Sequence, residues 1–162
     1  MTATYEPIAT TTLGSNAASY TFSSIPSTYT DLVLVASIKG TTNDQIVRVR
    51  FNSDTGSNYS TTSLIGTGSS AVSQRQTTQT SIRIAHLNSN SNFDPHIVSI
   101  NNYANTTTYK STLARENSVT VGVSATVGLW RSTSAVTSIE IFRENSNMVT
   151  GSTLTLYGIK AK

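Results

Sequence analysis

The feature that most constrains this chain is a steady alternation between short β-type runs and turn signals. Gly, Pro, Asn, Asp and Ser clusters recur roughly every 8–15 residues, a rhythm typical of β-sandwiches and barrels. We expect strands over Tyr5–Thr11, Ala18–Ser23, Asp31–Lys39, Gln45–Phe51, Tyr59–Ile65, Thr80–Leu87, His96–Tyr103, Thr107–Arg115, Val121–Trp130, Val136–Arg143 and Ser152–Ile159. No segment shows helical periodicity, so we expect no helix of more than a turn or two.

The apolar residues within these runs have a period of two. Val47, Val49 and Phe51 share one face of their run, while Arg48 and Arg50 share the other. This is the pattern of a strand with one buried face, because successive side chains of a strand point to opposite sides.

The run Asp31–Lys39 differs from that pattern, because five consecutive residues in it are apolar. A strand of this kind is expected to be buried on both faces, at the centre of a sheet or at a contact between subunits. The alternation returns in Ile139–Arg143 and Ser152–Ile159.

Composition supports a β fold. Ser and Thr make up roughly a third of the 162 residues, and only 12% are charged. Thr packs well on pleated sheets, and Ser favours turns. Disorder is the competing interpretation of such a chain, but regular apolar runs and a net charge of +3 argue against it.

Taken together, these patterns predict an all-β chain with two packed antiparallel sheets. A jelly roll is the first choice and another β-sandwich the second. The length fits one domain over residues 1–162. Two segments are predicted to be polar loops that contact a partner or face solvent. They are Gly66–Thr78 and Asn88–Asn92.

A search for catalytic groups predicts none. His86 alternates with Ile82 and Ile84, which favours a hydrogen-bonded core histidine. His96 follows Asp94, and an Asp–His pair with one of many serines could be drawn as a triad, but no nucleophile elbow is present.

Other site types are also not expected. The loop Asp54–Asn58 faintly resembles a cation loop but lacks its repeated acids and distal Glu, so we predict no metal site. Glu140 and Glu144 fall on one strand face, where Arg143 could pair with them. No glycine pattern for a nucleotide cofactor appears. The aromatic residues could line a sugar site, although core packing is their usual role.

The overall charge and hydropathy exclude several partners. Eleven basic and eight acidic residues form no dense cluster, so nucleic-acid binding is not expected. No apolar run approaches membrane-spanning length, and Met1–Gly14 lacks the basic and apolar regions of a signal peptide. Without Cys, disulfides are excluded.

Several segments resemble a recurring type of structural protein in tailed-bacteriophage particles, notably of cyanobacterial and marine phages. They are YTFSSIP (Tyr20–Pro26), YTDLVLV (Tyr29–Val35), FNSDTGSNYS (Phe51–Ser60), INNYANTTTYK (Ile100–Lys110), GLWRS (Gly128–Ser132) and GSTLTLYGI (Gly151–Ile159). The resemblance covers most of the chain in order. It implies a β-rich structural component and carries no catalytic residues.

The resemblance leads to a specific expectation of function. The chain is expected to be a capsid decoration or cement protein, not an enzyme, made in the host cytoplasm and located on the capsid surface of the virion. Its expected partners are the major capsid protein and other copies of itself, as a homotrimer at threefold positions of the shell. The alternative is a tail fibre, baseplate or receptor-binding module with a carbohydrate-binding face.

Overall fold

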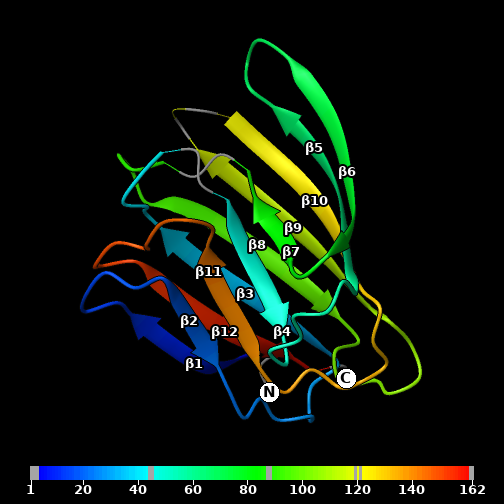
Figure 1. Cartoon of the computed structure of the whole chain (residues 1–162). Helices are drawn as coiled ribbons and strands as arrows, with labels where there is room; N and C mark the ends of the chain where they lie inside the picture. The colour runs from blue at the N-terminus through cyan, green and yellow to red at the C-terminus, as the bar shows by residue number, and fades with distance from the viewer. Residues whose placement is uncertain (1–3, 44–45, 87–88, 119, 121, 161–162) are drawn as a thin grey trace.

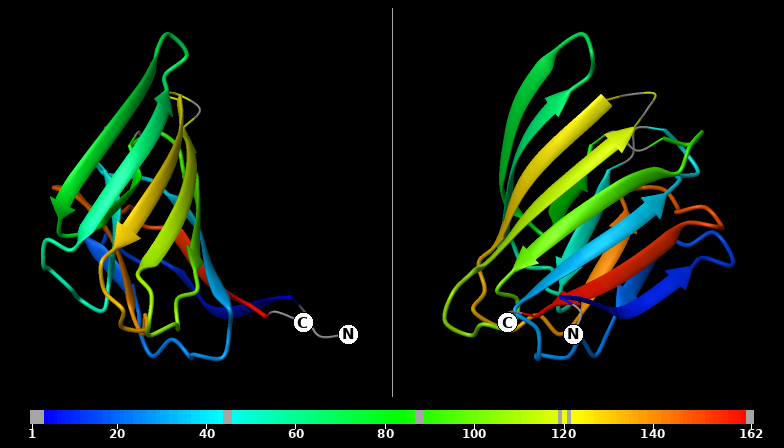
Figure 2. Two further views of the ribbon diagram at one scale, coloured as in Figure 1. Left: turned by 90° about the vertical axis from the view of Figure 1, so that its right-hand side faces the viewer. Right: turned by 180° about the vertical axis from the view of Figure 1, so that it is seen from behind.

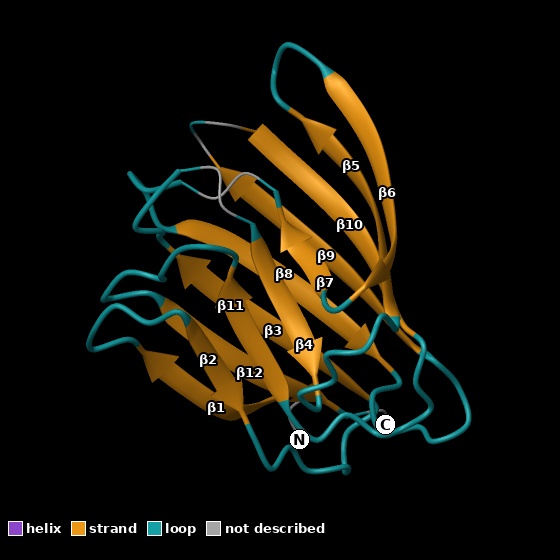
Figure 3. Ribbon diagram, in the orientation of Figure 1, coloured by secondary structure: helices purple, strands orange, loops and turns teal. Residues whose placement is uncertain are grey.

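The structure is a computed structural model that describes residues 4–43, 46–86, 89–118, 120 and 122–160. These residues form strands and loops with no helix (Figure 3). The strands are β1 (Tyr5–Thr12), β2 (Ser19–Phe22), β3 (Asp31–Ile38), β4 (Val47–Phe51), β5 (Tyr59–Gly66), β6 (Ala71–Gln79), β7 (Ile82–Ala85), β8 (Asp94–Asn101), β9 (Lys110–Ser118), β10 (Gly122–Trp130), β11 (Ile139–Arg143) and β12 (Thr153–Ile159).

The strands form two antiparallel sheets, which confirms the predicted β-sandwich. The larger sheet has eight strands in the order β1-β12-β3-β8-β9-β10-β5-β6, and the smaller has four in the order β2-β11-β4-β7. Figure 1 shows the smaller sheet in front of the larger one, and the hairpin β5–β6 projects beyond both. Two further views show the same projection (Figure 2). The predicted jelly-roll connectivity stays a prediction at this point.

The period-two runs form strands as expected. Val47, Val49 and Phe51 of β4 are fully buried and point between the sheets. Ile139 and Ile141 of β11 are buried opposite them, because β11 pairs with β4 in register. The core contains one connected cluster of buried apolar residues drawn from both sheets.

The strand β3 lies centrally, between β12 and β8, as predicted. The prediction that both its faces are buried is wrong for the single chain. Leu32 and Leu34 are fully buried, but on the opposite face Val33 is half-buried and Val35 is 38% exposed. The larger sheet has no second layer on that side among the described residues, so its outward valines remain open to solvent.

The predicted loop Gly66–Thr78 is also wrong over most of its length. Residues from Ala71 onwards form β6, the last strand of the larger sheet. Its side chains are exposed or half-buried throughout, so no buried face imposes apolar alternation, and the sequence reads as a loop.

Several predicted boundaries shift by a few residues. The expected run Thr80–Leu87 contributes only Ile82–Ala85, and Thr107–Arg115 becomes Lys110–Ser118. Parts of some predictions lie outside the described residues, namely Gln45, Leu87, Asn88 and Val121.

Candidate interaction surface

The most distinctive surface of the molecule is the side of the larger sheet that faces away from the smaller one. We call this side the outer face, and we define it by the outward side chains of β3, β5, β9 and β10. It carries five exposed apolar residues, which are Leu64 (60% exposed), Val123 (57%), Val127 (55%), Leu113 (45%) and Val35 (38%).

The strand register brings these residues together. Ala125 on β10 lies opposite Leu64 on β5, and Val127 lies opposite Leu113 on β9. Directly opposed residues of antiparallel strands have neighbouring side chains on the same face. The apolar side chains of β5, β9 and β10 therefore form a contiguous patch, while Val35 on β3 is separated from it by β8.

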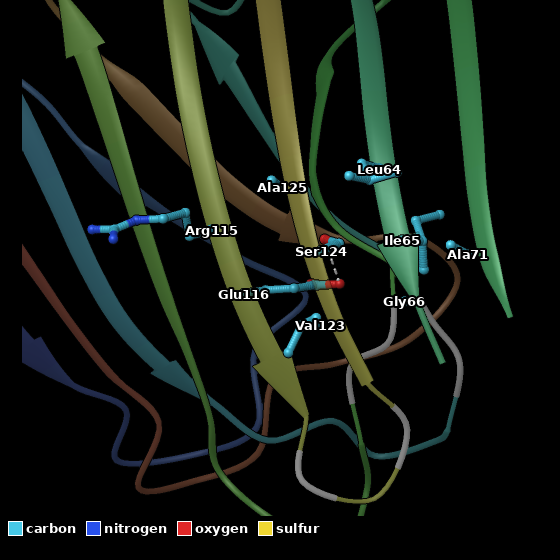
Figure 4. A pocket seen from close by; sticks show the side chains of 9 residues that line it. All are labelled: Leu64, Ile65, Gly66, Ala71, Arg115, Glu116, Val123, Ser124 and Ala125. Atoms are coloured by element: carbon cyan, nitrogen blue, oxygen red, sulfur yellow. Dashed lines mark hydrogen bonds between the residues drawn. The ribbon is translucent and has the colours of Figure 1, made fainter. Parts of the chain in front are cut away.

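A hollow of about 390 Å³ lies at one end of this patch, where β5, β9 and β10 run side by side (Figure 4). Most of its lining comes from outward positions. The lining residues are Leu64, Ile65, Gly66, Ala71, Arg115, Glu116, Val123, Ser124 and Ala125.

The inward side of the same strands carries many polar residues beside the buried apolar Tyr59, Ile65, Ala114 and Trp130, so buried polar and exposed apolar side chains occur on the same strands. Ser124 and Thr126 of β10 are buried, whereas Ala125 between them and Val123 and Val127 on either side are exposed. Strands β5 and β9 repeat this arrangement, with Ser63, Lys110, Thr112, Glu116 and Ser118 among their buried side chains. Polar residues that are buried and apolar patches that are exposed depart from the usual burial pattern, and such departures can indicate an interaction site.

Several of the buried polar groups are bonded to one another. The carboxylate Oε1 of Glu116 accepts hydrogen bonds from Ser124 Oγ at 2.9 Å and from the backbone N–H of His86 at 2.6 Å. Thr126 Oγ1 donates to Ser63 Oγ at 2.9 Å. Hydrogen bonds of this kind offset the free-energy cost of burying polar atoms. The fold can therefore keep these polar side chains on the buried side of the strands.

His86 lies in this network, half-buried just after the end of β7. Its Nδ1 is 3.1 Å from Arg83 Nη1, and its Nε2 is 2.7 Å from Ser63 Oγ. A guanidinium can only donate, so Nδ1 accepts and Nε2 carries the proton that it donates to Ser63. In this tautomer His86 cannot take a proton from Ser63, so the pair lacks the arrangement of a nucleophile and its base.

The ring of His86 is neutral at ordinary pH. Burial, with the nearby positive charges of Arg83 and Arg48, lowers the pKa of His86 to about 4. The prediction of a hydrogen-bonded histidine fits this position.

The predicted Asp94–His96 pair is buried on one face of β8. His96 is 1% exposed, and burial together with Arg143 lowers its pKa to about 4. Its Nδ1 lies 3.9 Å from Glu116 Oε2, which is a polar contact rather than an ion pair because the ring is neutral. Asp94 accepts a hydrogen bond from the backbone N–H of Ser89 at 2.7 Å and so fixes Ser89, in the loop that precedes β8.

The loop that resembled a cation site holds the sandwich together instead. Asp54 Oδ2 accepts hydrogen bonds from the Trp130 indole at 2.7 Å and from Asn58 Nδ2 at 2.9 Å. Asp54 Oδ1 accepts one from the Gly56 N–H at 2.8 Å. Burial alone raises the pKa of Asp54, but these three donors outweigh it and hold the pKa below its usual value. Both carboxylate oxygens are engaged by N–H donors.

Glu140 and Glu144 lie on one face, as predicted, but they pair with β4 rather than with Arg143. Glu140 bonds Arg50 at 2.7 Å, and Glu144 contacts Arg48 at 3.1 Å. Arg143 points to the other side, where it is buried and donates to Ser146 Oγ and Thr42 O. Alternation along β11 places Arg143 with the core residues, which explains why local pairing fails.

Two features of this region were not predicted from the sequence. The apolar positions of β10 alternate correctly, but alternation alone assigns them to the buried side. Lys110 is fully buried, and its Nζ donates to the carbonyls of Thr108 and Thr133 at 2.8 and 3.3 Å. No signal in one sequence identifies a lysine that backbone carbonyls enclose.

Comparisons with known proteins add no relatives. The chain matches no protein-family model. No curated protein matches it significantly. Within the described ranges there is no helix long and apolar enough to cross a membrane, and no grouping of three or more His, Asp or Glu side chains that could hold a metal ion.

Proposed function

We propose that the chain is a structural protein of a tailed-bacteriophage particle, and that it decorates the capsid by docking its outer face on the shell. The observation that carries this proposal is the exposed apolar side of β5, β9 and β10. A contiguous patch with Leu64, Leu113, Val123 and Val127 exposed lies on strands whose buried side carries many polar residues. Contiguous apolar patches on a soluble protein mark sites of association.

The physical work of such a protein is interface burial. Removing apolar surface from water stabilises the contact by about 25 cal/mol per Å². A stable interface needs about 800 Å² on each partner. The outer face extends over several strands and carries few charges, and Arg115 within the patch can pair with an acidic group of the shell.

The connectivity of the strands supports the proposal. Without the hairpins β5–β6 and β9–β10, two four-stranded sheets remain, β1-β12-β3-β8 and β2-β11-β4-β7. We propose that these eight strands form a jelly roll. Along the chain, every connection between successive members of the eight crosses from one sheet to the other, except the one from β4 to β7. Jelly rolls recur in viral capsid and lectin domains. The two hairpins then enlarge one sheet and carry most of the patch.

The partners in this proposal are the major capsid protein and other copies of the chain. A homotrimer at the threefold positions of the shell would repeat the outer face on each copy. The resemblance of six segments to phage structural proteins supports the same assignment.

The proposal is tested by binding to emptied phage shells. Val127→Asp places a charge in the patch and should abolish binding, while the thermal unfolding midpoint stays close to that of the unmodified protein. Tyr109→Asp is the matched control, because Tyr109 is 56% exposed and lies in the loop before β9, outside the strands that carry the patch. Equal binding by both variants would contradict the proposed docking face.

A second candidate function rests on an exposed aromatic pair. The rings of Tyr5 and Tyr157 contact edge to face with centroids 6.4 Å apart, and Tyr5 is 57% exposed. Aromatic faces of this kind stack on sugars, as a receptor-binding module of a tail fibre or baseplate would require. Glycan-array binding that Tyr5→Ala removes, without binding to shells, would favour this candidate.

A further inference from the structure

The sandwich has four sheet edges, and they differ in how they are protected. Strands β1 and β6 end the larger sheet, and β2 and β7 end the smaller one. An edge strand exposes unpaired backbone N–H and C=O groups that can pair with another chain. Natural proteins therefore shorten, bend or block their edges.

Three of the four edges carry such protection. Strand β1 contains Pro7 and a register shift between Pro7 and Ala9. Strands β2 and β7 have only four residues each. These edges offer little template for another strand.

The fourth edge, β6, lacks these devices along most of its length. It has nine residues without proline, and Arg75 is its single charged side chain. Its register with β5 is continuous from Ala71 to Gln76, and among the described strands it pairs only with β5. Its side chains are open to solvent on both faces of the sheet. This edge can therefore pair with an extended strand of another chain.

We propose that β6 pairs antiparallel with β6 of a second copy of this chain, around a twofold axis at Gln74. Gln74 is the midpoint of Val72–Gln76, so a twofold axis there uses five of the six residues in regular register with β5. Directly opposed residues of antiparallel strands share a face. Ser73 then lies opposite Arg75 of the other copy, and Val72 opposite Gln76.

The charges of β6 favour this register and this partner. A twofold axis at Arg75 would place the two Arg75 guanidinium groups opposite each other. A twofold axis at Gln74 instead places the hydroxyl of Ser73 opposite each guanidinium group. The remaining side chains are hydroxyls, amides and small apolar groups, which are compatible with their own copies. A second copy thus supplies an extended, self-complementary strand whose one charged residue, Arg75, does not meet its own copy in this register.

The pairing would also join the two outer faces. Leu64 lies opposite Ser73 within one copy, next to the edge. A twofold axis at Gln74 therefore brings the patches of both copies to the same side of one continuous sheet. This inference rests on the edge alone and does not depend on docking to a capsid. If copies form trimers, the same contact links the trimers in pairs.

Charge variants at Ser73 test both the contact and its register. Ser73→Arg places an arginine opposite Arg75 of the other copy, twice across the axis, and should weaken self-association. Ser73→Glu places a glutamate opposite Arg75 at the same two places and should strengthen it. Each change is expected to be roughly tenfold in the dissociation constant at low salt. The double variant S73R/R75E should restore association. Sedimentation velocity over a concentration series measures all four proteins.

A cysteine variant gives an independent readout, since the chain contains no cysteine. Gln74→Cys should form an intermolecular disulfide on mild oxidation, because the two copies of that residue meet at the axis. Tyr109→Cys, at a position that is also exposed, should not. Equal dissociation constants for Ser73→Arg and Ser73→Glu, or equal cross-linking at the two cysteine positions, would overturn the proposal. Shell binding by the same variants is measured separately, so failure of the capsid role is distinguishable.

Discussion

The indole Nε1 of Trp130, at the end of β10, donates a hydrogen bond to Asp54 Oδ2 in the loop after β4, at 2.7 Å. This bond joins the larger sheet to a loop of the smaller one. It also orients the indole against Phe51 and Tyr59, with ring centroids 5.5 and 6.2 Å away. Asp54 is therefore a structural residue whose role depends on Trp130.

Asp54→Ala should lower the free energy of unfolding by about 2 kcal/mol, since hydrogen bonds to a charged acceptor contribute about 1.5–3 kcal/mol. Chemical denaturation of Asp54→Ala, Trp130→Phe and the double variant measures how far the two residues depend on each other. A coupling energy above about 0.5 kcal/mol is expected for residues in contact. Strictly additive losses would contradict the assigned role.

The buried histidines predict that stability falls in mild acid. The pKa of His86 and of His96 is about 4 in the folded chain, against 6.5 for a free histidine. Between these values the unfolded chain binds more protons, so stability is fully present above about pH 6.5 and is lost as pH falls toward 4. The loss is at most about 3 kcal/mol for each histidine, and smaller for half-buried His86, whose charge water can screen.

Unfolding free energies measured from pH 7 to 4 check this dependence. His96→Gln should flatten the curve more than His86→Gln, because His96 is more deeply buried. An unmodified protein as stable at pH 4.5 as at pH 7 would rule the assignment out.

Gly128 marks a close approach between the two sheets. A Cβ at this position would lie 2.4 Å from Thr112 Oγ1 and 2.5 Å from Ile82 Cγ2. Gly128→Ala should therefore destabilise the chain by about 1–3 kcal/mol through overpacking. Gly14→Ala is the control, because nothing lies within 4 Å of its added Cβ, and its effect should stay within about 0.5 kcal/mol. Equal effects of the two changes would refute this account of the packing.

The sequence predicted the β-sandwich because most of its central strands alternate strictly. Val47, Val49 and Phe51 show the reason, since their burial requires a period of two and leaves Arg48 and Arg50 on the other side. Strand β6 was missed because neither of its faces is buried, and so nothing constrains its pattern.

The outer face could not be predicted from the alternation of its residues. In β10 the odd-numbered valines alternate with Ser124 and Thr126, and that pattern fits either orientation of the strand. The choice depends on Glu116, His86 and Ser63, which lie on other strands and loops and bond the polar side inward. Such a network is visible only once the strands are paired.

The measurement that tests the proposed capsid role most directly is the copy number of the chain in purified particles of a phage whose genome is found to carry its gene. Quantitative mass spectrometry against the major capsid protein, or a reconstruction of the particle, would provide it. The proposal predicts hundreds of copies on the capsid surface, with the outer face toward the shell. A few to dozens of copies at the tail, or none in the particle, would contradict it.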